Sequence, residues 1–356
     1  MAHRWAAVQS GEARGLPATG LRGLLWVASL LYRSGRWLHR GLYRSGLKRR
    51  HRLSVPVISI GNLSAGGVGK TPLVAWLGQQ LLARGRRPAV LARGYGRRPG
   101  EALNEEGEWL RSAVPDMPVL QDPQRGRAAE EFLRSADCDV FLLDDGFQHE
   151  ALHRDLELVL LDATRPLGFG YLLPRGTLRD SPARLTDADL VLLTRCELLS
   201  GEQLDEVEST LKPWLNHVPG RIAMPVDQIQ VGDQLQPSSC LQDRDVLLAC
   251  AVGHPQSVEQ TIQQLGGKVV ERRWFSDHHD YQSADVVWML EQASQQQAVV
   301  VTTAKDWIKL RRLWPDDQDP PHVLQQRLTI QQGEDVFWQA VEAVLPSSTI
   351  TPPAET

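Results

Sequence analysis

The chain has 356 residues, of which 42% are hydrophobic, and this is enough to build one large or two medium globular domains. Its four cysteines, Cys138, Cys196, Cys240 and Cys250, are scattered without CxxC spacing. That distribution argues against a zinc centre and against a disulfide framework, and it is typical of a protein in a reducing cytosol.

The net charge of −4 conceals an uneven distribution of charge along the chain. Residues 13–100 contain 17 of the 39 lysines and arginines but no aspartate or glutamate, so the remainder of the chain is strongly acidic. Such segregation indicates an anionic partner for the N-terminal part of the protein. Nucleic acid, anionic lipid and a phosphorylated substrate are all compatible with it.

The first predicted element is a basic amphipathic helix within residues 1–52. Apolar residues recur at helical spacing over 21–32, and arginines and a basic cluster at 48–52 follow them. The uninterrupted apolar run is too short to span a bilayer, and the basic stretch after it does not fit a signal peptide. We therefore expect a helix that lies on an anionic membrane surface. The alternative is a core-packed helix with a solvated arginine face.

Residues 55–77 carry the most informative pattern in the chain. An apolar run at 55–60 enters a glycine-rich loop, and a helix is predicted at 72–83. This order is that of a P-loop, whose backbone N–H groups and helix N-terminus bind a polyphosphate; the alternative is a tight turn that needs glycines for their conformation. One departure from the strict pattern is Ser64 in place of its first glycine. The residues expected to bind nucleotide are Ser64, Ala65, Gly66, Gly67, Val68, Gly69, Lys70, Thr71 and Pro72.

Strands alternate with helices after the P-loop. Strands are predicted at 88–92, 139–144, 156–162 and 189–194, and a helix at 126–135, whereas residues 98–126 look irregular. This alternation predicts a parallel α/β sheet that is covered on both faces. We expect a P-loop domain at 53–217, a connector at 218–240, a second, smaller α/β domain at 241–345 and a disordered tail at 346–356.

Two carboxylates follow the strand predicted at 139–144. Asp144 and Asp145 stand where a P-loop protein carries the aspartate that binds Mg²⁺, at the carboxyl end of a strand. An ordinary Asp-Asp-Gly turn is the alternative. Gly146-Phe-Gln-His149, with Arg154-Asp155 after it, is more distinctive than a turn requires.

Taken together, the motifs resemble the tetraacyldisaccharide 4′-kinases, the lipid A kinases of Gram-negative envelope synthesis. They occur in the family's order: Ser59-Ile-Gly-Asn-Leu-Ser-Ala-Gly-Gly-Val-Gly-Lys-Thr-Pro72, Arg93-Gly-Tyr-Gly-Arg97, Asp144-Asp-Gly-Phe-Gln-His149, Arg154-Asp155, Phe275-Ser-Asp-His-His279 and Thr303-Ala-Lys-Asp306. The similarity runs from the basic N-terminal helix to about Leu345. Ser or Thr at the first P-loop glycine is also a habit of this family.

The resemblance implies a kinase that transfers the γ-phosphoryl of ATP, with Mg²⁺, to the 4′-hydroxyl of tetraacyldisaccharide 1-phosphate. It also implies two α/β domains around a cleft and a peripheral protein on the cytoplasmic face of the inner membrane. The basic helix then has two anionic partners, the membrane and the substrate. We expect the protein to be a monomer. We also expect it to bind no nucleic acid, because no helix-turn-helix, zinc or RNA-binding aromatic signature is visible.

Roles of individual residues follow from the family motifs. Lys70 is expected to contact the phosphates, and Thr71, Asp144 and Asp145 to bind Mg²⁺. Glu197 matches an acidic position of the family near the nucleotide and metal, although an exposed glutamate at a helix start would look the same. Substrate contacts are expected from the remaining motif residues, with solvated surface as the alternative for the cations: Arg93, Arg97, Gln148, His149 and Lys305.

The catalytic base has to be chosen among three carboxylates. In the family it is an aspartate in a Gly-Asp-Glu segment, which works with a histidine of the second domain. This chain has Asn104-Glu105-Glu106 there, so Glu105 replaces the aspartate, and Glu106 or Asp144 are the alternatives. His278 is the candidate for the partner histidine.

A membrane-associated ATPase switch of the MinD/ParA type is a competing interpretation, because those proteins also use Gly-Gly-Val-Gly-Lys-Thr beside a membrane helix. They carry a signature lysine where this chain has Ala65, and they lack the Asp144-Asp-Gly-Phe-Gln-His149 segment and the second domain. A nucleic-acid-binding module is supported only by the basic stretch.

Overall fold

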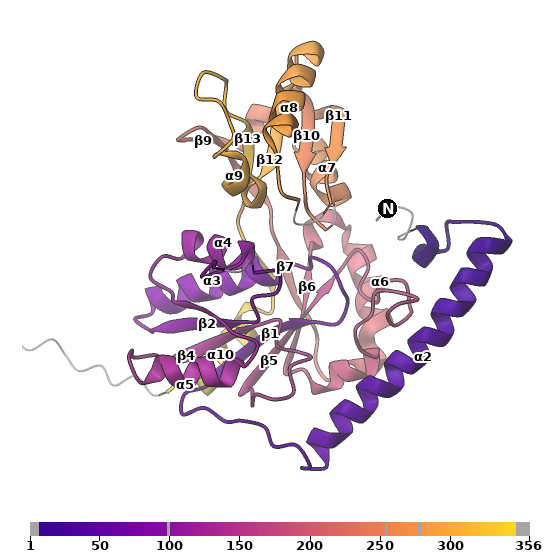
Figure 1. The fold of residues 1–356 in the computed structure, drawn as a ribbon, viewed down its shortest axis with the longest axis vertical. Helices are drawn as coiled ribbons and strands as arrows, with labels where there is room; N and C mark the ends of the chain where they lie inside the picture. Colours follow the sequence, from indigo (N-terminus) through magenta and orange to yellow (C-terminus); the bar gives the residue numbers. More distant parts are fainter. Residues whose placement is uncertain (1–6, 98–99, 254, 277–278, 347–356) are drawn as a thin grey trace, which may run out of the picture.

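The structure, a computed structural model, describes residues 7–97, 100–253, 255–276 and 279–346. Its elements gather around two sheets, one of eight strands and one of six. Figure 1 shows the unit with the smaller sheet standing above the larger one, and a long helix, α2, along the outside. This arrangement confirms the predicted α/β fold with a second, smaller α/β unit.

The eight-stranded sheet has the strand order β14-β7-β6-β5-β1-β4-β2-β3, and all its neighbouring pairs are parallel except β14 with β7. Every residue of β1 and β5 is buried, which explains their nearly continuous apolar sequences. The strands are β1 (Val57–Asn62), β2 (Pro88–Ala92), β3 (Val119–Gln121), β4 (Val140–Asp144), β5 (Leu156–Asp162), β6 (Leu190–Thr194), β7 (Gly220–Ala223) and β14 (Thr329–Gln332).

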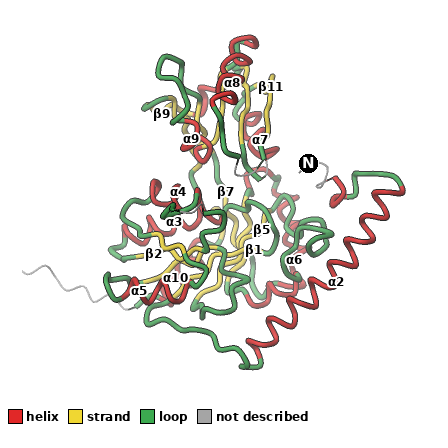
Figure 2. The backbone as a smooth tube through the Cα atoms, viewed as in Figure 1, coloured by secondary structure: helices red, strands yellow, loops and turns green. Residues whose placement is uncertain are grey.

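Helices cover both faces of this sheet, as Figure 2 shows. Ile58 and Ile60 of β1 lie in one core with side chains of α3, α4 and α10. Val57 lies in a second core with Ala129 of α5, and α6 packs in a third. The alternation of side chains along β1 therefore places successive residues in opposite layers. The helices are α3 (Lys70–Ala83), α4 (Glu105–Ala113), α5 (Arg125–Leu133), α6 (Gly201–Leu211) and α10 (Glu334–Val344).

The six-stranded sheet has the order β11-β10-β12-β13-β8-β9. Its first four strands are parallel neighbours, whereas β8 and β9 add antiparallel at one edge. Its strands are β8 (Val226–Val231), β9 (Gln234–Pro237), β10 (Asp245–Cys250), β11 (Lys268–Trp274), β12 (Val299–Thr303) and β13 (His322–Gln326). Its helices are α7 (Pro255–Gln264), α8 (Ser283–Gln296) and α9 (Ala304–Leu310).

The sheets divide the chain differently from the predicted ranges. Strands β8 and β9 lie inside the predicted connector 218–240, and β14 and α10 join the larger sheet although they lie inside the predicted second domain, 241–345. Both strands of the β8–β9 hairpin are rich in glutamine and half exposed, so they lack the apolar signal of a buried strand. Residues 98–126 were expected to be irregular, yet they contain α4 and β3. Within the predicted tail, residues 347–356 lie outside the described residues.

The chain passes between the two units twice. Met224 and Pro225 connect β7 to β8, and Arg327 and Leu328 connect β13 to β14. The two connections lie side by side, because the Arg327 N–H donates a hydrogen bond to the Pro225 carbonyl at 3.0 Å. The units are thus joined by a pair of hydrogen-bonded segments.

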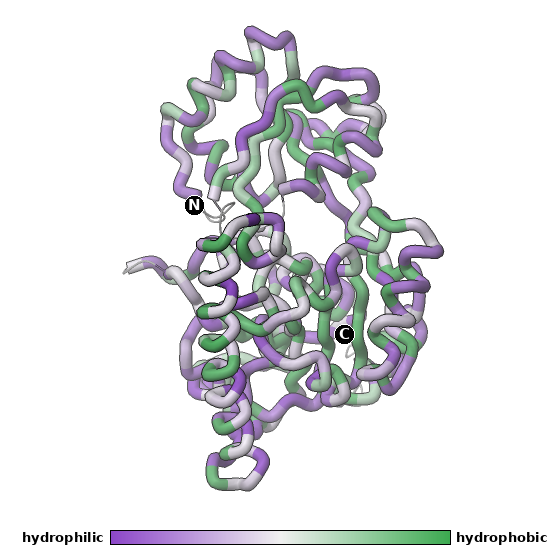
Figure 3. Tube along the Cα trace, turned by 90° about the vertical axis from the view of Figure 1, so that its right-hand side faces the viewer, coloured by the Kyte–Doolittle hydropathy of each residue, from purple (hydrophilic) through white to green (hydrophobic). Residues whose placement is uncertain are grey.

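Helix α2 (Leu16–Arg44) buries only a narrow stripe against the larger unit, with Leu25 and Ser29 as its buried residues. Figure 3 faces this helix and shows apolar and polar residues interspersed along it. No helix in the described part of the chain is both long and apolar enough to cross a membrane. Large apolar side chains remain exposed along α2: Leu16, Leu21, Leu24, Trp26, Val27, Leu30, Leu31, Trp37 and Leu38.

Candidate active site

The glycine-rich loop links the end of β1 to the start of α3. Gly69 caps α3 with φ 89°, a left-handed conformation that favours glycine, and a Cβ there would lie 2.9 Å from Met224 Cε. The N–H groups of the first turn of α3 therefore open toward the loop with their partial positive charge. Lys70 Nζ lies 3.1 Å from Asn62 Oδ1 and 3.4 Å from Asp145 Oδ1.

Asp144 ends the strand beside the P-loop strand, with Ile60 of β1 as its register partner. Its carboxyl group is buried, and burial, followed by the charge of Glu106, raises its pKa to about 7. Within the described residues, Asp144 Oδ1 is buried and has no hydrogen-bond partner. A buried oxygen left without a donor is the condition that a cation corrects, so the acidic pair fits Mg²⁺.

Asp145 adopts φ 53°, which turns its side chain away from the strand direction and toward Lys70. Arg179 Nη1 donates to both of its carboxylate oxygens, at 2.7 and 2.8 Å. Burial would raise the pKa of Asp145, but the charges of Lys70 and Arg179 outweigh it and hold the pKa below its usual value. Asp145 is therefore an anion with two cationic partners.

A cleft of about 1480 Å³ lies between the two units and brings most of the predicted site together. Thr71 and Arg93 line it from the larger unit, and Lys305 lines it from α9 of the smaller one. Glu197 also lines the cleft; burial raises its pKa, and it accepts a hydrogen bond from the Met224 N–H at 3.2 Å. The other lining residues from the sequence prediction are Gly66, Gly67, Val68, Gly69, Lys70, Pro72, Asp144 and Asp145.

Among the described residues, no group of three or more histidine, cysteine, aspartate or glutamate side chains could hold a metal ion alone. At phosphate-transfer sites, Mg²⁺ is usually held by one or two carboxylates together with waters and substrate phosphates. The two aspartates and the Thr71 hydroxyl therefore suit a metal that arrives with a nucleotide.

Several predicted residues support the loops around the cleft instead of lining it. Arg97 Nη1 donates to the carbonyls of Ala102 and Gln121, at 3.3 and 3.1 Å. Gln148 Nε2 donates to the Asn62 carbonyl at 2.7 Å. Burial, with Arg125 and two further arginines nearby, lowers the pKa of His149 to about 4, so its imidazole is neutral at physiological pH.

The first two residues of the loop are likewise structural. Ser64 is buried, and its backbone bridges to Leu178. The Ala65 N–H donates to the Thr177 carbonyl at 2.7 Å, so that contact occupies this donor of the loop. The segment 177–179 thus packs directly against the start of the P-loop.

Glu105, the predicted base, begins α4 beside the cleft. Its Oε2 lies 2.7 Å from Lys309 Nζ, and its Oε1 lies 3.7 Å from Lys305 Nζ. Both lysines belong to α9, so these ion pairs join the two units. Glu106 lines the cleft with Asp144, whose pKa its charge helps to raise.

His278 lies outside the described residues. Its neighbour His279 is fixed in the smaller unit: its ring stacks on Phe275 at a centroid distance of 4.6 Å, and its Nε2 lies 3.0 Å from Asp285 Oδ2. Lys309 Nζ donates to the His279 carbonyl at 2.9 Å. The lysine that holds Glu105 is therefore bound to this histidine segment as well.

Sequence reasoning missed four residues that the structure places at the site. Asn62 holds Lys70, and Arg179 holds Asp145. Arg195 donates to the carbonyl of Gly67 and pairs with Asp162, while Arg125 is buried behind Asp145, with Nη1 3.5 Å from its carbonyl. Asn62 and Arg195 each stand at the carboxyl end of a predicted strand, which was a usable signal. Arg179 lies in a long irregular segment that carries no such signal.

The fold and the site define the class of this protein: a P-loop protein of the α/β type, with an acidic pair on the strand beside the loop. A family model described as LpxK, tetraacyldisaccharide-1-P 4′-kinase, matches residues 21–346. The chain therefore belongs to the tetraacyldisaccharide 4′-kinase family, and the resemblance found in its motifs is confirmed.

Individual relatives agree with this assignment. A tetraacyldisaccharide 4′-kinase of Anaeromyxobacter sp. (strain Fw109-5) is 36% identical over 90% of this chain and 91% of its own length. One from Pseudoalteromonas atlantica (strain T6c / ATCC BAA-1087) is 35% identical over 83% and 90%. The crystal structure of "apo" form LpxK from Aquifex aeolicus in complex with ATP has a TM-score of 0.71 and 26% identity, over 92% of this chain and 100% of that one.

Proposed function

We propose that this protein transfers the γ-phosphoryl group of ATP to the 4′-hydroxyl of tetraacyldisaccharide 1-phosphate. The observation that carries this proposal is the contact of Lys70 with Asp145 at 3.4 Å, at the start of α3 and in a cleft shared by two units. Family membership and the ATP complex of a related structure support the same reaction. The product bond joins the 4′ oxygen to the γ-phosphorus, and ADP leaves.

Catalysis rests on positioning and electrostatics in this proposal. The loop N–H groups and Lys70 bind the β- and γ-phosphates, and Arg93 and Lys305 supply further positive charge in the cleft. Thr71, Asp144 and Asp145 would hold Mg²⁺, with Glu197 close by. When bound, Mg²⁺ would neutralise charge on the phosphates and the leaving group.

Glu105 is proposed as the base that accepts the proton of the 4′-hydroxyl. It lies between the two units, and its ion pair with Lys309 at 2.7 Å orients its carboxylate. Glu106 is the second candidate, because it lines the cleft with Asp144. We propose His278 as the partner of the base.

We also propose that α2 binds the anionic cytoplasmic face of the inner membrane, with the protein acting as a monomer. The exposed fractions of Leu31 and Trp37, 73% and 76%, leave apolar side chains available to lipid. Arg33 on α2 and Lys48 just after it are exposed as well and would meet lipid phosphates. The acyl chains of the substrate would then stay in the bilayer while its sugar reaches the cleft.

The test is transfer of ³²P from γ-labelled ATP to detergent-dispersed tetraacyldisaccharide 1-phosphate. Wild type should label the lipid, and Lys70→Ala should lower the rate on the order of a hundredfold or more, because a cation that stabilises the transferring group is lost. Lys212→Ala, a substitution at a lysine outside the cleft, is the matched control. ATP hydrolysis without labelled lipid would contradict the proposal and favour an ATPase switch.

A further inference from the structure

The segment that contains Arg179 connects the active site to the outer helix. On the active-site side, Arg179 Nη1 holds both carboxylate oxygens of Asp145 and lies 3.4 Å from Gln148 Oε1. The side chain lines the cleft. Arg179 is therefore the partner that fixes the direction of a predicted metal-binding carboxylate.

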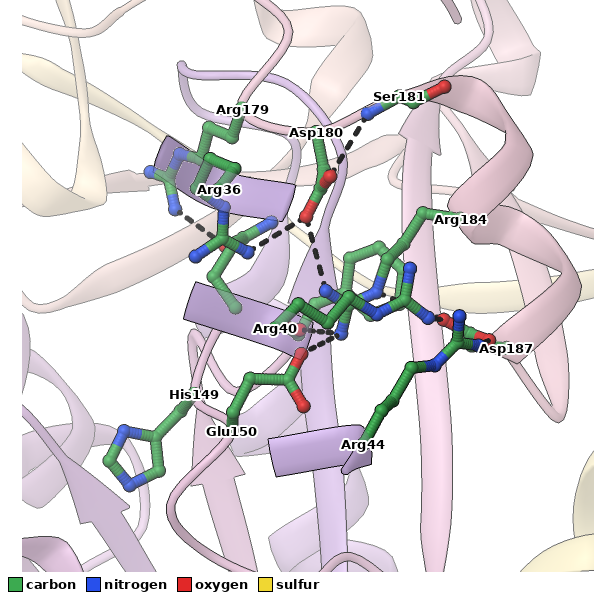
Figure 4. A network of polar contacts seen from close by, with 12 residues as sticks. Arg36, Arg40, Arg44, His149, Glu150, Arg179, Asp180, Ser181, Arg184 and Asp187 are labelled. Carbon is green, nitrogen blue, oxygen red and sulfur yellow. Dashed lines mark hydrogen bonds and ion pairs between the residues drawn. The ribbon is translucent and has the colours of Figure 1, made fainter. Parts of the chain in front are cut away.

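Helix α2 holds the backbone of the same segment. The Tyr32 hydroxyl donates to the Arg179 carbonyl at 3.0 Å. Arg36 Nη2 lies 2.8 Å from Asp180 Oδ2, with exposed side-chain fractions of only 19% and 13%. Figure 4 shows Arg36 reaching Asp180 from α2, next to Arg179. These two contacts, on Arg179 and Asp180, thus fix the backbone position from which the Arg179 side chain extends.

A buried arginine, Arg184, contacts the same oxygen of Asp180 that Arg36 contacts. Arg184 is 2% exposed; its Nη1 lies 3.1 Å from Asp180 Oδ2 and its Nη2 lies 2.7 Å from Glu150 Oε1. The same Nη2 donates to the Phe147 carbonyl at 2.8 Å, in the segment that follows Asp145. Figure 4 shows this network spanning from α2 to Glu150. Asp180 Oδ2 is consequently shared by Arg36 of α2 and by Arg184, which also holds the segment that follows Asp145.

We propose that Arg179 is a positioning residue for Asp145, and that α2 sets the place of Arg179 through Tyr32 and Arg36. The proposal rests on the proposed function of the cleft and extends it: α2 belongs to the metal-binding apparatus as well as to the membrane contact. Asp145 is half exposed, and its other ion pair, with Lys70 at 3.4 Å, reaches only one carboxylate oxygen, so Arg179 is the partner that holds both. When Arg179 shifts, the carboxylate keeps Lys70 at 3.4 Å but loses the contact that holds both of its oxygens in the direction of the metal.

The sharpest test compares two arginines of the same helix. Arg36 contacts Asp180, whereas Arg33 is exposed and makes no ion pair within the residues that the structure describes. Arg36→Met and Arg33→Met remove the same charge from α2 and add the same side chain, so their effect on membrane attraction is matched. The measurement is binding of a fluorescent, non-hydrolysable ATP analogue as a function of Mg²⁺ concentration, in detergent and without membranes.

Arg36→Met should raise the Mg²⁺ concentration for half-maximal binding about tenfold, the loss expected for a charge-assisted contact, while Arg33→Met matches wild type. Tyr32→Phe, which removes one hydroxyl, should also raise this Mg²⁺ concentration, by a smaller factor. Arg179→Ala should lower kcat on the order of a hundredfold, because a misplaced group costs that much, and Arg179→Lys should restore part of it. Thermal unfolding midpoints identify any variant that fails to fold.

Equal Mg²⁺ dependence in Arg36→Met, Arg33→Met and Tyr32→Phe would overturn the proposal, since α2 would then act on the membrane alone. A loss confined to substrate presented in vesicles would overturn it in the same way. Failure of wild type to label the lipid would instead refute the proposed function, and the nucleotide-binding comparison would still report on Arg179.

Discussion

The Asp144 carboxyl group is buried at the end of β4, and burial raises its pKa to about 7. An aspartate in the unfolded chain titrates near about 4. Between these values the folded protein binds the proton more tightly than the unfolded chain does. The free energy of unfolding contributed by this residue therefore decreases as pH rises from about 4 to about 7, and stays constant above that range.

Asp144→Asn should remove this dependence. We expect the variant to be more stable than wild type at pH 8 by a few kcal/mol, and the difference to shrink toward pH 4, while phosphoryl transfer is lost. Chemical denaturation at several pH values in nucleotide-free buffer measures it. Subtracting the pH dependence of the free energy of unfolding of wild type from that of the variant cancels the contributions of other titrating groups, such as His149. A constant difference across the pH range would contradict the assigned pKa.

The choice between two neighbouring glutamates is also decided at the level of single residues. Glu105→Gln should lower kcat by about 10²–10⁴, as loss of a general base does, and leave the KM for ATP nearly unchanged. Glu106→Gln is isosteric and one residue away, which makes it the matched control. The pH profile of kcat in each variant is the measurement. A greater loss in Glu106→Gln would transfer the role to Glu106.

At the scale of elements, helix α2 combines two contacts that face different directions. Its large apolar side chains are exposed to solvent, while Arg36 and Tyr32 contact the larger unit. Leu31→Ser with Trp37→Ser should weaken vesicle binding on the order of a hundredfold, because two large apolar side chains lose their burial in lipid. Activity on detergent-dispersed substrate should remain, since neither residue belongs to the Arg179 network.

Co-sedimentation with vesicles of anionic phospholipid measures this binding. Val287→Ser, at an exposed apolar residue on α8, controls for general loss of surface hydrophobicity. Undiminished sedimentation of the α2 variant would show that another surface holds the membrane.

The elements that sequence predicted well are those with a strong periodic or continuous apolar signal. The strand predicted at 156–162 matches β5, and the helix predicted at 72–83 lies within α3. Strands β8, β9 and β14 were missed because they are glutamine-rich and half exposed, and β9 and β14 are also four-residue strands at sheet edges. Helix α4 was missed because its nine residues follow an irregular stretch and bury only Gly107 and Leu110.

The residues of the candidate site also differ in whether a local sequence pattern could predict them. Lys70, Thr71 and the aspartate pair could be found because chain neighbours and adjacent strands place them. Arg179 could not, since its role depends on an irregular segment whose position is set by a helix some 140 residues away. The lysine pair on Glu105 depends in turn on how the two units meet, which no local pattern encodes.

At the scale of the whole molecule, helix α10 completes the core of the larger unit that contains Ile58 and Ile60. Phe337 on α10 is fully buried and packs against Trp76 of α3, with ring centroids 5.7 Å apart. Phe337→Ala should therefore lower the free energy of unfolding of the larger unit by about 3–5 kcal/mol. Val336→Ala, at an exposed neighbour, should change it little. Urea denaturation measures both, and equal effects would contradict the packing.

The paired segments between the units also determine how the cleft can open. A single connecting segment would allow one unit to rotate freely over the other, whereas two segments joined by a hydrogen bond would restrict the motion to rotation about one axis. Met224, in the first of these segments, donates its N–H to Glu197, and its side chain leaves no room for a Cβ at Gly69 of the P-loop. A rotation about these segments would leave the P-loop near the pivot and would move α9 relative to α4. Opening and closing would make and break the bond between Lys309 and Glu105 without disturbing a nucleotide already in place.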